Sequence, residues 1–302
     1  LYCSLLILGC QWMNAQVPRY NYHVKNRVII NNNNHNLIRM ALVLPLAQTN
    51  QYQTVSNVNT HGGELLPVPN TDDLYVRWHF NDDRATVNQV SELYYEFDVV
   101  LNAYSFDFEK LGKIFPYDTT SDLFVRYTGS SGAYVNIVDY AKKCYEYVAA
   151  NYKYINPFTG LHPLQTILKA GGGDCGNLSS IYISLLRNKK IPARHIVTVK
   201  PNGEYHVWAD FYLEQHGWIP VDVTFKNSDP EGNYFGIYDG NGIVMTKDVW
   251  LPLEMGEGEI YFAEILQSYY LWTWTNPVNP PVSNHKLTSI RYALGETMVH
   301  AD

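Results

Sequence analysis

The segment Gly171-Gly-Gly-Asp-Cys175-Gly-Asn-Leu-Ser-Ser-Ile-Tyr-Ile-Ser-Leu-Leu186 is the most informative part of the chain. Its apolar residues recur at helical spacing, which predicts an amphipathic helix with one face toward a core. Asp174 has the side chain of a helix N-cap, and Lys189-Lys190 suit the negative end of the helix dipole. A thiol in the first turn of a helix lies at the positive end of the dipole, which favours the thiolate. Two interpretations of Cys175 are open at this point, a nucleophile and a buried structural thiol.

Composition indicates a globular protein with a large core. The 302 residues allow one large domain or two of ordinary size, and 46% of them are hydrophobic while 17% are charged. The formal net charge of −7 argues against a nucleic-acid partner and against a polybasic membrane patch. The 25 tyrosines are typical of a β-rich protein.

The first fifteen residues resemble the remnant of a signal peptide. Their apolar run, Leu5 to Leu8, is too short to span a bilayer. Cleavage after Ala15 would release a soluble protein, whereas Ile7-Leu8-Gly9-Cys10 resembles a bacterial lipobox and would anchor the chain in the outer membrane through lipidated Cys10. We favour simple export and predict a periplasmic or cell-surface protein. A mature chain with only Cys144 and Cys175 has no disulfide framework, and we expect Cys144 to be buried.

Residues 17–130 read as an all-β domain. Apolar residues alternate with polar ones from Leu74 to Phe80 and from Leu93 to Leu101, as in half-buried strands. A strongly apolar run from Asn36 to Leu46 precedes them, and segments rich in Asn, Asp and Gly separate them. This pattern predicts an antiparallel sandwich.

The pattern changes after Gly129-Ser-Ser-Gly132, a predicted linker. Residues 131–275 read as an α+β core in which helices pack on an antiparallel sheet, and residues 276–302 as a C-terminal extension. Within the core, helices are expected over about 136–150, 163–170 and from Cys175 on, and strands over 195–199, 205–213 and 218–223.

His206 and Asp222 follow Cys175 at informative positions. Alternation places His206, Trp208 and Asp210 on one strand face. If this strand forms a hairpin with residues 217–224, turning near Glu214, Asp222 lies directly opposite His206. A slip of one residue would send Asp222 to the other face. The predicted geometry is the one that nucleophilic acyl transfer needs, with a thiolate, an imidazole that moves a proton, and a carboxylate that orients the imidazole.

Other residues near this constellation have weaker assignments. The backbone N–H of Cys175 could stabilise an oxyanion, and Gln165 is the nearest upstream side chain that could assist. Trp208 and Trp218 share the predicted face with His206, where they either pack around the site or contact substrate. We expect Asp210 to be solvated at a strand edge. No metal or cofactor is predicted, because the paired Cys or His spacing of a zinc site is missing.

The order of these motifs resembles the transglutaminase-like superfamily. The resemblance rests on four motifs over about residues 135–250: Gly173-Asp-Cys175, Ile191-Pro-Ala-Arg194, His206-Val-Trp208, and Gly217-Trp218 followed by Asp222 and Thr224. It implies a papain-like core with Cys175, His206 and Asp222 as the triad. Residues 17–130 are similar to the sandwich that precedes this core in exported bacterial members. Two departures, Val223 in place of a frequent proline and Gly176-Asn177 in place of a common acidic residue, bear on the substrate more than on the chemistry.

The resemblance implies a cysteine enzyme that acts on amide bonds of a peptide or protein. Water as acceptor would make it a peptidase or amidase, and an amine would make it a transamidase; the family does both. With no sign of a calcium loop, we favour hydrolysis, with cell-wall peptide as one candidate substrate. The alternative is a non-catalytic protein that keeps the fold and recognises glycan or protein at the cell surface.

Overall fold

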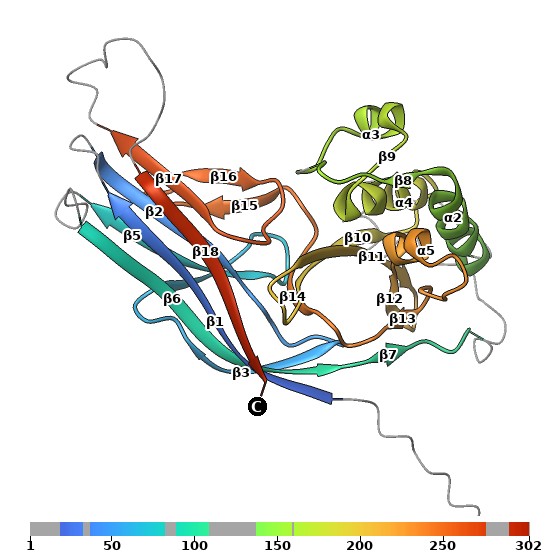
Figure 1. Ribbon diagram of the computed structural model, residues 1–302, viewed down its shortest axis with the longest axis horizontal. Helices are drawn as coiled ribbons and strands as arrows, with labels where there is room; N and C mark the ends of the chain where they lie inside the picture. The colour runs from blue at the N-terminus through green and yellow to red at the C-terminus, as the bar shows by residue number, and fades with distance from the viewer. Residues whose placement is uncertain are drawn as a thin grey trace, which may run out of the picture.

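The computed structural model describes residues 19–32, 37–81, 89–108, 137–158, 160–275 and 290–301. The predicted signal-peptide remnant with Cys10 and Ala15, and the linker at 129–132, lie outside these residues. A β-sandwich lies beside a unit that carries all the helices of the described residues (Figure 1). None of these helices is long and apolar enough to cross a membrane. The predicted α+β class, with a strand-rich N-terminal part, is confirmed.

The sandwich consists of two four-stranded sheets, with orders β18-β1-β6-β3 and β17-β2-β5-β4. All their pairings are antiparallel, and the apolar alternation seen in the sequence fills the space between the sheets. The strands are β1 (Arg19–Asn32), β2 (Leu37–Leu46), β3 (Gln53–Asn59), β4 (Glu64–Pro67), β5 (Leu74–Asn81), β6 (Gln89–Asn102), β17 (Tyr270–Thr275) and β18 (Ile290–Ala301).

The last two strands complete the sandwich from the far end of the chain. β18 pairs with β1 and β17 pairs with β2. Residues 270–275, expected in the core, and residues 290–301, expected in a C-terminal extension, thus belong to sheets with N-terminal strands. Alternation predicts a strand but does not name its partner, because pairing depends on the approach of distant segments. The division of the chain into domains stays a prediction.

β2 is apolar over most of its length because both of its faces are buried. Leu42 and Leu44 point into the sandwich, while Ala41 and Val43 lie under the hairpin of β15 (Leu251–Glu254) and β16 (Ile260–Ala263). The hairpin packs on the outer face of the second sheet. Between Glu259 and Thr275 the chain forms two separate strands, β16 and β17.

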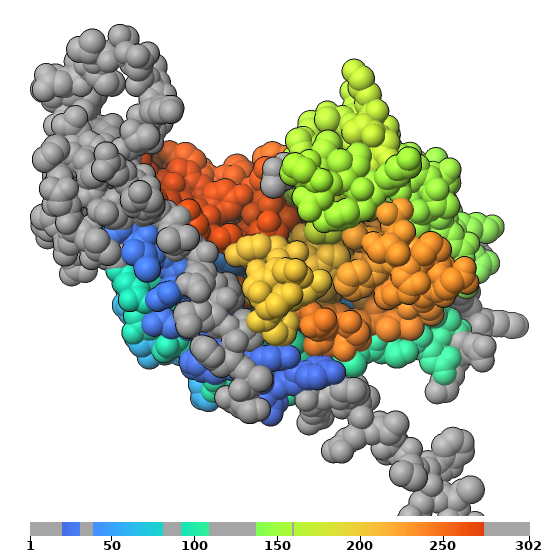
Figure 2. Space-filling model, in the orientation of Figure 1, coloured from blue at the N-terminus to red at the C-terminus, as the bar shows by residue number. Residues whose placement is uncertain are grey.

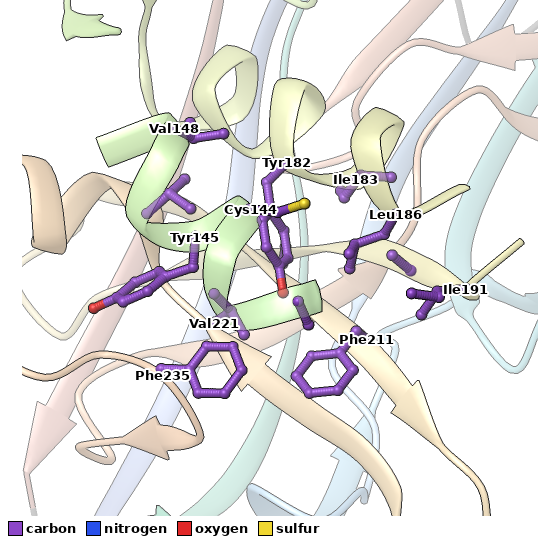
Figure 3. Packing of buried hydrophobic residues seen from close by; sticks show 14 of the residues in the cluster. Cys144, Tyr145, Val148, Tyr182, Ile183, Leu186, Ile191, Phe211, Val221 and Phe235 are labelled. Atoms are coloured by element: carbon purple, nitrogen blue, oxygen red, sulfur yellow. The ribbon is translucent and has the colours of Figure 1, made fainter. Parts of the chain in front are cut away.

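The helical unit has a four-stranded antiparallel sheet of order β12-β11-β10-β14. Helices α2 and α4 contact each other, and α4 covers β10 and β11. Figure 3 shows their shared core, where Cys144 lies beside Tyr182. The elements are β7 (Tyr104–Ser105), α2 (Ile137–Asn151), β8 (Lys153–Tyr154), α3 (Leu164–Ala170), β9 (Gly172–Gly173), α4 (Cys175–Asn188), β10 (Ala193–Val199), β11 (Tyr205–Leu213), β12 (Gly217–Val221), α5 (Val223–Ser228), β13 (Ile237–Tyr238) and β14 (Ile243–Lys247).

Buried polar contacts join this unit to the sandwich. The hydroxyl of Tyr52 donates to Asp210 Oδ1 at 2.8 Å, and Arg194 lies 3.2 Å from Asp210 Oδ2. The Gln53 side chain exchanges two 2.8 Å hydrogen bonds with the backbone of Val244. The expectation of a solvated Asp210 is wrong, since it is fully buried. The alternation of residues predicted the correct strand face for Asp210, but it could not show that the loop with Tyr52 covers this face.

Candidate active site

The glycine turn before Cys175 packs its backbone directly against the backbone of residues 153–155, and this contact positions the cysteine. β8 and β9 pair in parallel, and Ile155 N donates to Gly173 O at 2.9 Å. A Cβ at Gly172 would lie 1.9 Å from the carbonyl oxygen of Lys153, and one at Gly173 would lie 2.5 Å from the Cβ of Asn177. Only glycine fits at these two positions without backbone movement.

Helix α4 begins at Cys175. Asp174 is its N-cap and accepts from Asn177 N at 3.0 Å, as the sequence predicts. The backbone N–H of Cys175 lies in the first turn, where the helix itself supplies no acceptor. The thiol is half-buried and points toward a groove, because the glycine turn delivers it at the end of the helix instead of in its packed middle.

Asn177 braces the loop beside the cysteine. Its side chain is fully buried, donates to the carbonyl of Gly160 at 2.8 Å and accepts from His162 N at 3.0 Å. A buried amide with these partners fixes the loop that carries Gly160 and Leu161 along the groove. The asparagine that departs from the acidic residue common in the resembling family thus has a structural use here.

His206 and Asp222 face each other in a different register from the predicted one. Asp210 pairs with Pro220 and Tyr212 with Trp218, a shift of two residues that keeps every side chain on its expected face. The cause is a turn centred on Gln215, whose φ of 66° lies in the left-handed region, one residue beyond the predicted centre at Glu214. β12 ends before Asp222, yet His206 Nε2 lies 2.6 Å from Asp222 Oδ2.

Asp222 does two things at once. As the N-cap of α5, its Oδ1 accepts from Thr224 N at 3.0 Å and Phe225 N at 2.9 Å, while Oδ2 faces the imidazole. The carboxylate is therefore held from two sides, and only 7% of the residue is exposed. The cap was not predicted; Asp222-Val-Thr224 at the end of a strand is compatible with a helix start, but six residues are too few for a periodic signal.

The electrostatics favour a charged imidazole. Burial by itself would lower the pKa of His206, but the Asp222 carboxylate and a hydrogen bond to Cys175 raise it to about 10. Since Nε2 faces Asp222, Nδ1 is the nitrogen left for the thiol. The ring also stacks on Phe225 at 4.7 Å, which limits its rotation. At neutral pH the arrangement supports an imidazolium beside Cys175.

Two hollows meet at Cys175. One, of about 910 Å³, is lined by both Cys175 and His206; the other, of about 600 Å³, lies between the 158–161 loop and the segment that carries Ile265 and Gln267. The surface is notched between α3 and the β15–β16 hairpin, drawn in green and orange-red in Figure 2. A chain bound there would contact both parts of the molecule.

Tyr154 and Asn156 line both hollows, and sequence reasoning missed them. The β8–β9 pairing brings them beside Cys175. A two-residue parallel strand has no periodicity to detect, so no sequence signal could have found them.

The other predicted site residues lie in three different places. Trp208 is buried and lines a cavity together with His206. Gln165 is exposed on α3 and does not line the hollows around Cys175. Trp218 lies opposite Tyr212, six residues and thus about 20 Å along β11 from His206, where it stacks under Arg194 at 3.9 Å. Alternation places Trp218 on the right face but at the wrong end of the hairpin.

Residues 125–223 match the model of the transglutaminase-like superfamily. The match covers about a third of the chain. The match to the transglutaminase-like model contains Cys175, His206 and Asp222. No protein with a curated description is significantly similar to the chain.

One solved structure shares the fold of this chain and two others are similar to parts of it, all at low sequence identity. A protein of Cytophaga hutchinsonii described as a candidate cysteine protease is 12% identical with a TM-score of 0.51, over 94% of this chain and 98% of that one. LapG of Legionella pneumophila is 14% identical, with a TM-score of 0.32 over 46% and 76% of the two chains. The periplasmic domain of TgpA from Pseudomonas aeruginosa is 15% identical, with a TM-score of 0.30 over 70% and 91%.

Proposed function

We propose that this protein is an exported cysteine enzyme that hydrolyses amide bonds in peptides or proteins. The observation that carries the proposal is the buried His206–Asp222 contact of 2.6 Å beside a half-buried cysteine at a helix N-terminus. The transglutaminase-like fold of this region supports it. Export rests on the resemblance of the first fifteen residues to a signal peptide.

The proposed reaction has two steps, acylation of Cys175 and hydrolysis of the thioester, and Cys175, His206 and Asp222 act in both. The Cys175 thiolate attacks the carbonyl carbon, and the N–H of Cys175 donates to the oxyanion that forms. His206 gives its proton to the leaving amine, so the C–N bond breaks and an acyl thioester remains. Water then attacks the thioester, His206 takes its proton, and Cys175 is released with the acid. Asp222 keeps Nε2 protonated and the ring oriented throughout.

The oxyanion needs a second donor, and Gln165 does not line the hollows around Cys175. The Tyr154 hydroxyl and the Asn156 amide line both hollows next to Cys175. We include them in the proposal as alternative donors. Tyr154→Phe and Asn156→Ala separate them, because loss of one donor typically lowers kcat by about a hundredfold.

A peptide library of mixed sequence tests the proposal. We expect the wild-type chain to cut it, Cys175→Ala not to cut it, and a thioester of Cys175 to be trapped by acid quench and found by mass spectrometry. Added glycine methyl ester distinguishes hydrolysis from transamidation, since a transamidase would join it to the acyl fragments. A wild-type chain that cuts nothing and forms no thioester would leave the non-catalytic binding protein as the better interpretation.

A further inference from the structure

A cavity of about 90 Å³ lies behind the His206–Asp222 pair. His206 borders both this cavity and the hollow that contains Cys175, whereas Cys175 borders only the latter. Lys200 and Phe225 are the other residues common to the two. This volume is well below the range of about 300–1,000 Å³ typical of sites for a whole small ligand, and it suits a single side chain.

The walls of this cavity are aromatic. Trp208 and Tyr238 both line it, with ring centroids 5.0 Å apart. Phe225, which stacks on His206, and Tyr234, whose ring lies 5.5 Å from that of Phe225, line it as well. Trp208 and Tyr238 are buried and the Tyr238 hydroxyl is bonded to the backbone of Gly242, so their ring faces are what a ligand would meet. Such walls favour a planar aromatic or a large aliphatic group.

The chemistry of amide cleavage tells which part of a substrate this cavity faces. The imidazolium that donates a proton to the leaving nitrogen must be next to this nitrogen, while the acyl carbon bonds to Sγ of Cys175. The acyl part therefore lies in the hollow on the Cys175 side of His206. The leaving part continues past His206 and Phe225, and the cavity behind them is the enclosed space that it reaches.

We propose that this cavity binds the side chain of the residue that follows the scissile bond, and that it selects an aromatic or large aliphatic residue there. The inference rests on the proposed function and adds a substrate class to it. In a transamidation the incoming amine would occupy the same cavity, because it approaches the thioester along the path by which the leaving amine departs.

The test uses one acyl peptide joined to Phe, Leu, Ala or Glu amide, and its methyl ester. We expect the wild-type chain to cleave the Phe compound at least about tenfold better in kcat/KM than the Ala compound, with Glu the poorest. The methyl ester has a leaving group too small for the cavity and reports on the chemistry alone. Hydrolysis of the ester with no preference among the amides would overturn this inference and leave the proposed function intact. A chain that turns over none of the compounds would overturn both.

Two variants test whether the preference for Phe over Ala arises in this cavity. Tyr234→Ala removes one wall but keeps the backbone contacts of Tyr234, and Ile237→Phe narrows the cavity. Both should reduce the Phe-to-Ala ratio to within about threefold of unity. The control is Tyr261→Ala, an exposed tyrosine that packs on Trp272 of the sandwich and should leave the ratio unchanged. A ratio that neither cavity variant changes would show that the preference arises elsewhere and would overturn the inference.

Discussion

The two cysteines of the described chain lie in neighbouring helices and have opposite surroundings. Cys144 lies in the middle of α2, is 6% exposed and packs in the core beside Tyr182 (Figure 3). Burial raises the pKa of its thiol and so favours the neutral form. Cys175 is the first residue of α4, half-buried, at a groove, and in contact with His206. The difference teaches that position along a helix and one ionisable neighbour separate the proposed nucleophile from a core residue.

The largest effect that tests this contrast is on turnover. Cys175→Ala should abolish peptide hydrolysis, with a loss of at least about a thousandfold, because the proposed thioester forms on the sulfur of Cys175. Cys144→Ala should keep kcat within about twofold, since the Cys144 side chain lies in the core and lines none of the hollows around Cys175. Steady-state rates on one peptide, with circular dichroism to verify folding, measure both. Equal losses in the two variants would remove the contrast.

The second effect is on thiol reactivity. Iodoacetamide at pH 6 should alkylate Cys175 at least about a hundredfold faster than Cys144, because the thiolate is the reacting form. His206→Ala should slow the alkylation of Cys175 about tenfold and leave Cys144 unchanged. Peptide mapping by mass spectrometry follows each thiol separately. If His206→Ala has no effect on Cys175, the imidazole does not support the thiolate.

The third effect concerns the carboxylate. Asp222→Asn should lower kcat about a hundredfold, because a neutral amide holds the imidazolium less well. The free energy of unfolding should fall by only about 1 kcal/mol at neutral pH, since asparagine also caps helices and keeps the bonds from Thr224 and Phe225. Activity and urea unfolding are measured on the same preparation. Unchanged activity would show that the 2.6 Å contact has no part in turnover.

The fourth effect is the pH dependence of stability. Because the pKa of His206 is raised to about 10, its ion pair should contribute fully below pH 6.5 and lose its contribution as pH rises through 10. The stability difference between wild type and His206→Gln should therefore be larger at pH 6 than at pH 10, by about 2 kcal/mol. Urea unfolding at the two values measures it. In a Cys175→Ala background the difference between pH 6 and pH 10 should be smaller, because Cys175 also stabilises the imidazolium of His206. A difference that grows with pH would contradict the ion pair.

The smallest effect is on the core cysteine. Cys144→Ala should lower the free energy of unfolding by about 1 kcal/mol, the usual cost of a small cavity in a packed cluster. Cys175→Ala should cost less, because its side chain lies at a groove. Thermal or urea unfolding of both variants gives the comparison, and a reversed order would mean that Cys175 is the better-packed residue.

Much of the candidate site could be predicted from short-range patterns. The glycine turn, the Asp174 cap and the start of α4 are local, and the structure has them as expected. The facing of His206 and Asp222 was predicted through a register that is off by two residues, which succeeds because a shift of two preserves the face. Gln165 was proposed from proximity in the sequence, and this criterion fails because α3 points it away from the groove to solvent.

The sequence by itself determined what is set within a few residues: the helix that begins at Cys175, the strands of alternating residues, the buried fate of Cys144 and the superfamily motifs. Only the tertiary structure decided that strands 270–275 and 290–301 close the sandwich, that Tyr52 buries Asp210, and that Tyr154 and Asn156 reach the groove. The physical reason is that local propensity acts through neighbouring residues, whereas these contacts depend on segments that only the packed core brings together. The aromatic cavity behind His206 belongs to this second kind, because β11, α5 and the segment before β14 each supply part of its wall.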